Sequence, residues 1–255
     1  MKTTDTYETQ GGIQVFRSVE ELTLETPLQD VLDGLNRRRG ALFASGYEYP
    51  GRYSRWDIGF INPPIELKAR QRTFEFRALN ERGRVLLNIF RAGLEEHSHL
   101  ESLEVVDGHL HGCVQPMPTH FREEDRSKQP TIFSVLRALV EQMRSEDEPH
   151  LGFYGALGYD LVFQFEPIDM RHERAEDKPD LHLFVPDELI VVDHRKEQAL
   201  RYAYDFCYEG ASTQGLPRET GEAQAVRGEP SAVRSDHAPG EYADKVRTVI
   251  AGTQR

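Results

Sequence analysis

The stretch from residue 42 to residue 64 constrains the fold of this chain more than any other. Ala41 to Ser45 is a short apolar run, Pro50-Gly51 is a turn signal, and Tyr53 to Ile61 is aromatic and β-branched. Aromatic and β-branched residues suit a pleated, half-buried surface, and Pro and Gly end such runs. The stretch therefore predicts a strand, a turn and a second strand.

Three polar side chains lie inside this predicted hairpin, namely Ser45, Arg52 and Arg55. Burying a polar group in a strand pair is costly unless the group forms hydrogen bonds. These residues therefore belong either to the structural network of a twisted hairpin or to a ligand site.

Hydrophobic spacing predicts further strands and two helices. An apolar stripe that begins at Leu28, after Thr26-Pro27, predicts a helix over residues 27–38, and a second stripe predicts a helix over residues 131–144. Strands are predicted over residues 12–17, 41–45, 53–61, 65–69, 73–79, 181–185, 188–193 and 200–208. This order favours an α+β fold of sandwich-like antiparallel sheets with packed helices.

Two short polar segments predict turns between strands. Asn80-Glu81-Arg82-Gly83 is expected to form a hairpin turn, and Asp107-Gly108 is expected to be the tip of another hairpin. Residues 85–94 are apolar enough to be a strand that turns into a helix, and their pattern does not fix the changeover.

Charge and composition exclude several classes of function. The chain has 31 Lys and Arg against 43 Asp and Glu, so its formal net charge is −12, which argues against nucleic-acid binding. Its N-terminus has no apolar signal segment, and no window approaches the roughly 18 apolar residues that a membrane span needs. We therefore expect a cytoplasmic protein without membrane contact, in which Cys113 and Cys207 are buried free thiols.

The sequence shows no arrangement typical of a catalytic or metal centre. The histidine pairs at 97 and 99 and at 109 and 111 lack a carboxylate or Cys at metal-ligand spacing, so surface strand histidines are expected. Glycines at 152, 155 and 158 match neither a Rossmann nor a Walker pattern and favour a buried strand close to a neighbouring backbone. No Ser-His-Asp or Cys-His order stands out, so no catalytic residue is predicted.

Composition divides the chain into three parts. Residues 1–208 carry the predicted strands and helices, and residues 209–239 contain hardly any large apolar side chain, which predicts a flexible linker. Residues 240–255 then begin a helix whose apolar stripe includes Tyr242 and Val246.

Four segments of the chain resemble one enzyme family. Leu42-Phe43-Ala44-Ser45 resembles the Leu-Leu-Glu-Ser element of anthranilate synthase component I, and residues 47–56 are very similar to the form in enzymes that fuse this component to a glutamine amidotransferase. Residues 184–194 and the Gly-Tyr-Asp segment at 158–160 match the family as well. The resemblance runs from about Gly11 to the last residue.

The resemblance implies an inhibitor site in the hairpin. In this family the Leu-Leu-Glu-Ser strand lines the tryptophan feedback pocket, so Ser45 is expected to hydrogen-bond tryptophan, with Phe43 and Ala44 as its strand neighbours. Arg52 and Arg55 are further candidates for the partner of the ligand carboxylate. Ala44 stands where the family has Glu, which removes one partner for the ligand ammonium.

The resemblance also implies what the rest of the enzyme does. The family converts chorismate, with ammonia from glutamine, into anthranilate and pyruvate, and its catalytic residues and acidic Mg²⁺ ligands lie in the C-terminal half. Residues 1–208 would then be the regulatory domain, and residues 240–255 the first helix of a truncated chorismate-binding domain. The fragment alone is expected to be inactive and to bind tryptophan weakly, with the missing domain and a glutamine amidotransferase as partners.

Two alternatives remain open at this level. The same fold occurs in phenazine-type enzymes that stop at aminodeoxyisochorismate, and the residues that decide the product lie outside this chain. A non-catalytic small-molecule-binding module is the other alternative.

Overall fold

The computed structural model describes residues 2–44, 55–118, 121–146, 148–166, 171, 178–219 and 236–253. The chain divides into two compact units, Met1–Gln224 and Ala225–Arg255. Among the described residues, the first unit contains two antiparallel sheets and three α-helices, and the second contains one helix.

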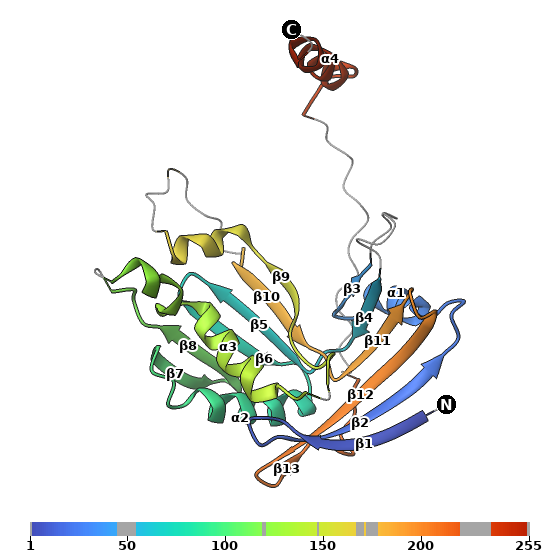
Figure 1. Cartoon of the computed structure of the whole chain (residues 1–255), viewed down its shortest axis with the longest axis vertical. Helices are drawn as coiled ribbons and strands as arrows, with labels where there is room; N and C mark the ends of the chain where they lie inside the picture. The colour runs from blue at the N-terminus through green and yellow to red at the C-terminus, as the bar shows by residue number, and fades with distance from the viewer. Residues whose placement is uncertain are drawn as a thin grey trace. The chain divides into compact units, whose positions relative to one another are not determined.

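In each of the two sheets of the first unit, pairs of consecutive strands are joined to one another by pairing between strands that are not consecutive in the sequence (Figure 1). The first sheet runs in the order β1 (Lys2–Glu8), β2 (Gln14–Leu22), β12 (Gln198–Tyr208), β11 (Glu188–Asp193), β4 (Trp56–Ile61) and β3 (Gly40–Phe43), with β13 (Ala211–Ser212) paired to β12. The second runs in the order β7 (Leu100–Val106), β8 (His109–Val114), β6 (Thr73–Ala78), β5 (Ile65–Arg70), β10 (Leu181–Val185) and β9 (Tyr154–Leu157).

The helices cover these sheets. α2 (Glu81–Leu94) packs on the second sheet and α3 (Ile132–Met143) packs on α2, whereas α1 (Gln29–Leu35) packs against β3 and β4 of the first sheet (Figure 1). Two short 3₁₀ helices, η1 (Glu123–Lys128) and η2 (Tyr159–Gln164), lie in the connections, and α4 (Glu241–Thr253) forms the second unit. No helix in the described ranges is long and apolar enough to cross a membrane.

Both sheets and the helices α2 and α3 share one hydrophobic core. Phe60 and Phe206 enter it from the first sheet, Phe76 from the second, and Ile89 and Leu139 from the helices. Each of these side chains is almost fully buried, and burial of such a side chain stabilises the fold by roughly 1.5–3 kcal/mol. The predicted α+β class with antiparallel sheets is confirmed.

The predicted hairpin turn at residues 80–83 is wrong, because these residues begin α2. The Asn80 side chain accepts a hydrogen bond from the Gly83 backbone N–H at 2.9 Å and so caps the helix, which then runs without a break to Leu94. Asn is favoured both in turns and at helix N-caps, so the local sequence fits either structure. The outcome is decided by Leu86, Ile89 and Phe90, which the helix buries in the core.

One other local prediction is confirmed and one is confirmed in part. Asp107 and Gly108 both have positive φ, 51° and 76°, as the tip of a two-residue hairpin between β7 and β8 requires. At Gly155 a Cβ atom would lie 2.1 Å from the His182 carbonyl oxygen, so only glycine permits this approach of β9 to β10. The predicted burial of this strand is wrong, because β9 is an edge strand whose residues from Gly155 to Leu157 are exposed.

Ordered structure continues beyond Tyr208, where the linker was predicted to begin. β13 pairs with β12, and Arg82 donates to the carbonyl oxygens of Thr213 at 2.7 Å and Leu216 at 3.2 Å. The composition of this segment did not predict its ordered structure, because hydrogen bonds and charges rather than apolar side chains attach it to the rest of the unit. Residues 220–235 of the predicted linker lie outside the described residues.

A buried ionic network holds this segment in place. We call it the Arg82 network, and it comprises Arg82, Asp187, Asp205 and Arg218 together with the backbone carbonyls of Tyr204, Thr213 and Leu216. Arg82 and Asp187 form an ion pair, and both are almost fully buried. Because a buried charge is tolerated only when it is paired and hydrogen-bonded, loss of a member of this network should destabilise the fold.

Candidate functional site

The two predicted strands form as β3 and β4, whose antiparallel pairing places Phe43 opposite Ile58, and the predicted turn at Pro50-Gly51 lies outside the described residues. Phe43 ends β3 and is 38% exposed, and Ala44 follows it as an exposed residue. Arg55 directly precedes β4. Ser45 and Arg52 lie outside the described residues, so their predicted contacts with a ligand stay predictions.

The Arg55 guanidinium already has partners within the protein. It pairs with Asp193 at 3.1 Å and lies over the Trp56 ring, 4.3 Å from the ring centroid. Burial opposes ionisation of Asp193, but the hydrogen bonds from Arg55 and from the turn that follows β11 hold the pKa of this carboxyl below its ordinary value. A ligand carboxylate at Arg55 would therefore share the guanidinium with Asp193.

Aromatic side chains from distant segments gather beside this hairpin. We call them the aromatic cluster, which consists of Phe43, Trp56, Phe60, His150, Tyr154 and Tyr202. One arm follows the hairpin strands, with the Tyr154 ring 6.2 Å from that of Phe43 and 5.9 Å from that of Phe60. The other arm centres on His150, whose ring lies 6.0 Å from that of Trp56 and 4.8 Å from that of Tyr202.

A hydrogen bond joins the two arms, because the Tyr154 hydroxyl donates to the His150 carbonyl oxygen at 2.6 Å. Burial raises the pKa of the Tyr154 hydroxyl to about 12 and lowers the pKa of the His150 imidazole. Both groups are therefore neutral near pH 7, and the cluster presents aromatic faces and edges rather than charge. Such surfaces bind planar aromatic rings well.

The segment that follows α3 brings a buried carboxylate behind this cluster. The turn between β1 and β2 is tied to the end of α3 by hydrogen bonds from the Gln10 N–H to Arg144 and from the Gly11 N–H to Gln142, at 2.9 and 3.0 Å. Glu148, a few residues later, is thereby placed against the first sheet.

Glu148 has two partners that form hydrogen bonds. Its carboxylate accepts from the Arg17 guanidinium at 2.9 Å and from the His150 backbone N–H at 2.7 Å. Arg17 also donates to Asp5 at 2.9 Å from its Nε atom. The contact with His150 links the carboxylate directly to the aromatic cluster.

Two tyrosine hydroxyls complete the group that we call the Glu148 cluster, namely Glu148, Arg17, Tyr7 and Tyr204. Burial first, and the nearby Glu148 charge second, raise the pKa of both tyrosines. Both hydroxyl oxygens are buried without a hydrogen bond of good geometry in the protein, although each lies near enough to Glu148 for a weaker hydrogen-bond interaction that also raises its pKa. Buried polar groups are nearly always hydrogen-bonded, so this cluster keeps unused hydrogen-bonding capacity next to the aromatic side chains.

Sequence reasoning found the hairpin half of this region and missed the other half. His150, Tyr154 and Tyr202 were assigned to structural strands or left without a role. Tyr202, Tyr204 and Phe206 occur at alternate positions of β12, a spacing that places three rings on one face of a strand and could have indicated the cluster.

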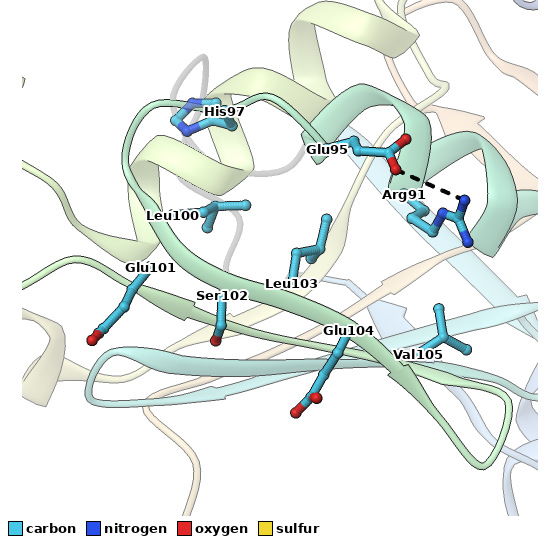
Figure 2. Close-up of a pocket in the computed structure, with 9 residues that line it drawn as sticks. All are labelled: Arg91, Glu95, His97, Leu100, Glu101, Ser102, Leu103, Glu104 and Val105. Atoms are coloured by element: carbon cyan, nitrogen blue, oxygen red, sulfur yellow. Dashed lines mark ion pairs between the residues drawn. The ribbon is translucent and has the colours of Figure 1, made fainter.

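A separate groove of about 360 Å³ lies between the end of α2 and the edge strand β7 (Figure 2). Figure 2 shows Arg91 and Glu95 on the helix side, where they form an ion pair of 3.9 Å. Glu101 and Glu104 lie on β7, which also has a register shift between Leu100 and Ser102. Charges and bulges of this kind protect sheet edges against further pairing, so the groove is best explained as a protected edge.

The described part of the chain offers no cluster of three or more His, Cys, Asp or Glu side chains that could hold a metal ion. The family resemblance places the Mg²⁺ ligands in the C-terminal half of the enzyme, and this placement stays a prediction. The predicted histidine pairs do lie close together, with ring centroids 5.4 Å apart for His97 and His99, but they pack on each other without carboxylate ligands.

Comparison with known proteins supports the family resemblance. No protein-family model matches the chain. It is 41% identical over 250 residues to an anthranilate synthase from Azospirillum brasilense, covering 98% of this chain and 34% of that protein. It is 24% identical to anthranilate synthase component 1 of Buchnera aphidicola, over 54% of this chain and 27% of the relative.

A third relative is the pyocyanine-specific anthranilate synthase component 1 of Pseudomonas aeruginosa, which is 26% identical over 70% of this chain and 33% of the relative. The chain thus spans only about a quarter to a third of the length of the relatives it matches. By sequence, the chain is related along almost its whole length to a part of an anthranilate synthase, and over 54–70% of its length to a part of anthranilate synthase component 1.

Proposed function

We propose that the chain is the ligand-sensing part of an anthranilate synthase and that the hairpin of β3 and β4 forms one wall of a tryptophan site. The observation that carries the proposal is the 41% identity to an anthranilate synthase over 98% of the chain. The hairpin segment is also the stretch whose residues resemble the feedback element of that family.

The chemistry beside the hairpin supports this ligand. An indole ring is a planar aromatic with one N–H donor, and the aromatic cluster offers ring faces and edges from Phe43, Trp56 and His150. Arg55, which directly precedes β4, is a candidate cation for a ligand carboxylate, in competition with Asp193.

In this proposal the chemical steps belong to parts of the whole enzyme that the chain does not span. The whole enzyme would convert chorismate and glutamine-derived ammonia into anthranilate and pyruvate in the cytoplasm. The sensing part would act with a chorismate-binding domain, which carries the Mg²⁺, and with a glutamine amidotransferase.

Titration of the chain with tryptophan by calorimetry tests the proposal. We expect weak binding, which Phe43→Ala weakens by about 2- to 10-fold through the loss of one aromatic contact. Val105→Ala, in the groove of Figure 2, is the matched control and should leave the affinity unchanged. If Ser45→Phe and Phe43→Ala both bind tryptophan as tightly as the unchanged chain, the hairpin does not line the tryptophan site. If the chain alone releases pyruvate from chorismate, the chemical steps do not belong to the parts of the enzyme outside this chain.

The pyocyanine-specific relative favours a second candidate, in which the whole enzyme serves another pathway than tryptophan synthesis. Expression of the full-length gene in a tryptophan auxotroph separates the two. Growth without tryptophan supports the first candidate, and failure to grow, with the protein present, supports the second.

A further inference from the structure

A pocket of about 580 Å³ lies on the α1 side of the first sheet. Its lining includes Asp57 from β4, Val192 from β11 and the loop that enters α1. Successive residues of a strand point to opposite faces, so Asp57 faces away from the side of β4 on which Trp56 joins the aromatic cluster. The pocket is therefore distinct from the proposed tryptophan site.

Its walls are mainly apolar. Leu24, Leu28 and Leu32 line it from the α1 side, and Val192 lines it from the sheet. Leu24 and Leu32 are 47% and 46% exposed, which is unusual for leucines that face the same hollow. A volume in the range of about 300–1,000 Å³ with apolar walls is typical of sites for small organic molecules.

Apart from one histidine, the ionisable side chains that line this pocket are all acidic. Among the described residues that line it, the ionisable ones are Glu25, Asp57, Glu197 and His194, with no Lys or Arg. The groove of Figure 2 contains Arg91, and a third hollow of about 320 Å³ on the second sheet contains Lys68. The groove of Figure 2 also has three glutamates, but only the α1 pocket among these three has carboxylates with no Lys or Arg among its described lining residues, so its complement is a cation.

Asp57 and His194 form a pair at the pocket, with His194 Nε2 and Asp57 Oδ2 2.8 Å apart. The other carboxylate oxygen, Oδ1, is buried without a hydrogen-bond partner. A carboxylate that is only half hydrogen-bonded in a poorly solvated place keeps a strong attraction for positive charge. His194 neutralises at most one of the three carboxylates, so the pocket stays negative whether the imidazole is protonated or not.

We propose that this pocket binds a small apolar molecule that carries one ammonium or amidinium group. The leucine walls hold the apolar body, and the cationic head lies toward Asp57 and Glu197. This inference is independent of tryptophan binding, because its residues lie on the other face of β4.

Paired probes test the proposal on the intact chain. Benzamidine carries a positive charge, and benzamide is neutral and nearly the same shape. We expect benzamidine to bind at least about tenfold more tightly, the effect of one charge-assisted contact, and to shift the NMR signals of the His194 ring. Equal affinity for the two probes, or binding that leaves His194 unshifted, would overturn the proposal.

Two variants test which carboxylates bind the positive charge of benzamidine. Asp57→Asn and Glu197→Gln should each weaken benzamidine binding by about threefold or more without changing benzamide binding. Glu75→Gln, in the hollow on the second sheet, is the matched control and should change neither. Glu197 lies in an exposed turn, so its variant remains informative if Asp57→Asn does not fold. Charge variants without effect, or binding of a basic apolar peptide but not of benzamidine, would reject a small-molecule site.

Discussion

Two buried polar clusters lie on either side of Tyr204 and differ in how completely their hydrogen bonds are formed. The Tyr204 carbonyl oxygen accepts from Arg82 at 2.8 Å and so belongs to the Arg82 network. Its side chain belongs to the Glu148 cluster, where the hydroxyl makes no hydrogen bond of good geometry. One residue therefore joins a fully satisfied cluster to an incompletely satisfied one.

The difference indicates different roles. In the Arg82 network, Nε, Nη1 and Nη2 of the guanidinium each donate to a carboxylate or carbonyl, and Arg218 adds a second cation at 2.8 Å from Asp187. Such completeness is what a structural attachment needs. The Glu148 cluster holds two hydroxyls beside the aromatic cluster that make no hydrogen bond of good geometry, so a ligand can supply a better partner there.

The largest expected effect is at Arg82. Arg82→Met keeps most of the side-chain volume but leaves Asp187 buried with Arg218 alone, so the free energy of unfolding should fall by about 3–5 kcal/mol. Urea denaturation measures this. Arg218→Met is the matched control and should lose less, because Arg218 is more exposed and Arg82 still pairs with Asp187. A loss below about 1 kcal/mol for Arg82→Met would show that the network does not hold the fold.

The second-largest expected loss of stability is that of Glu148→Gln, in the Glu148 cluster. Glu148→Gln removes the charge that faces Arg17 and weakens one of the two hydrogen bonds of this carboxylate, so we expect a loss of about 1.5–3 kcal/mol in the free energy of unfolding. Asp5→Asn, at the exposed partner of the same arginine, should lose only about 0–1 kcal/mol. If Glu148→Gln costs as much as Arg82→Met, the two clusters do not differ in the way proposed.

A third buried carboxylate, that of Glu66, is expected to make the stability of the fold depend on pH. Burial alone would raise its pKa, but hydrogen bonds from His182 at 2.8 Å and Lys68 at 3.1 Å lower the pKa from 4.5 to about 2. A lowered folded-state pKa means that the stabilisation is present above about pH 4.5 and is lost as the pH falls toward about 2.

Glu66→Gln should therefore lower the free energy of unfolding by about 1–3 kcal/mol at pH 7 and flatten its decline on acidification. Glu75→Gln, on the same sheet and more exposed, is the control and should leave the acid slope nearly unchanged. An unchanged slope in Glu66→Gln would mean that its two partners do not stabilise the ionised form.

Much of the fold was predictable because its signals are local. The β3–β4 hairpin, the strands β10 to β12 and the helices α1 and α3 follow from spacing and turn residues within short windows. α2 was misjudged at its start because Asn80 fits both a turn and a cap, and only burial of the helix face against the second sheet decides between them.

The site was predictable only in part, for the same reason. Phe43 and Arg55 belong to a recognisable local hairpin, whereas Tyr154 and Tyr202 lie in strands that pair with sequence-distant strands, and His150 lies in the loop before β9. Arg82 is a similar case: a lone arginine normally indicates surface, and its partner Asp187 lies 105 residues away. Contacts between residues this far apart in the sequence cannot be predicted from a local residue pattern.

The smallest expected change in the free energy of unfolding is that of Tyr204→Phe, and it tests whether the Glu148 cluster and the Arg82 network differ in their hydrogen bonding. Tyr204→Phe removes a buried hydroxyl that makes no hydrogen bond of good geometry and leaves the carbonyl contact with Arg82 in place, so the free energy of unfolding should change by no more than about 0.5 kcal/mol. Tyr154→Phe is the matched control, because its hydroxyl donates to His150 at 2.6 Å and its removal should cost about 1 kcal/mol. If both variants lose the same amount, the Tyr204 hydroxyl is bonded after all, and unused hydrogen-bonding capacity no longer separates the Glu148 cluster from the Arg82 network. If they differ as expected, the Tyr204 hydroxyl is free to bond a ligand, and tryptophan titration of Tyr204→Phe then shows whether it does.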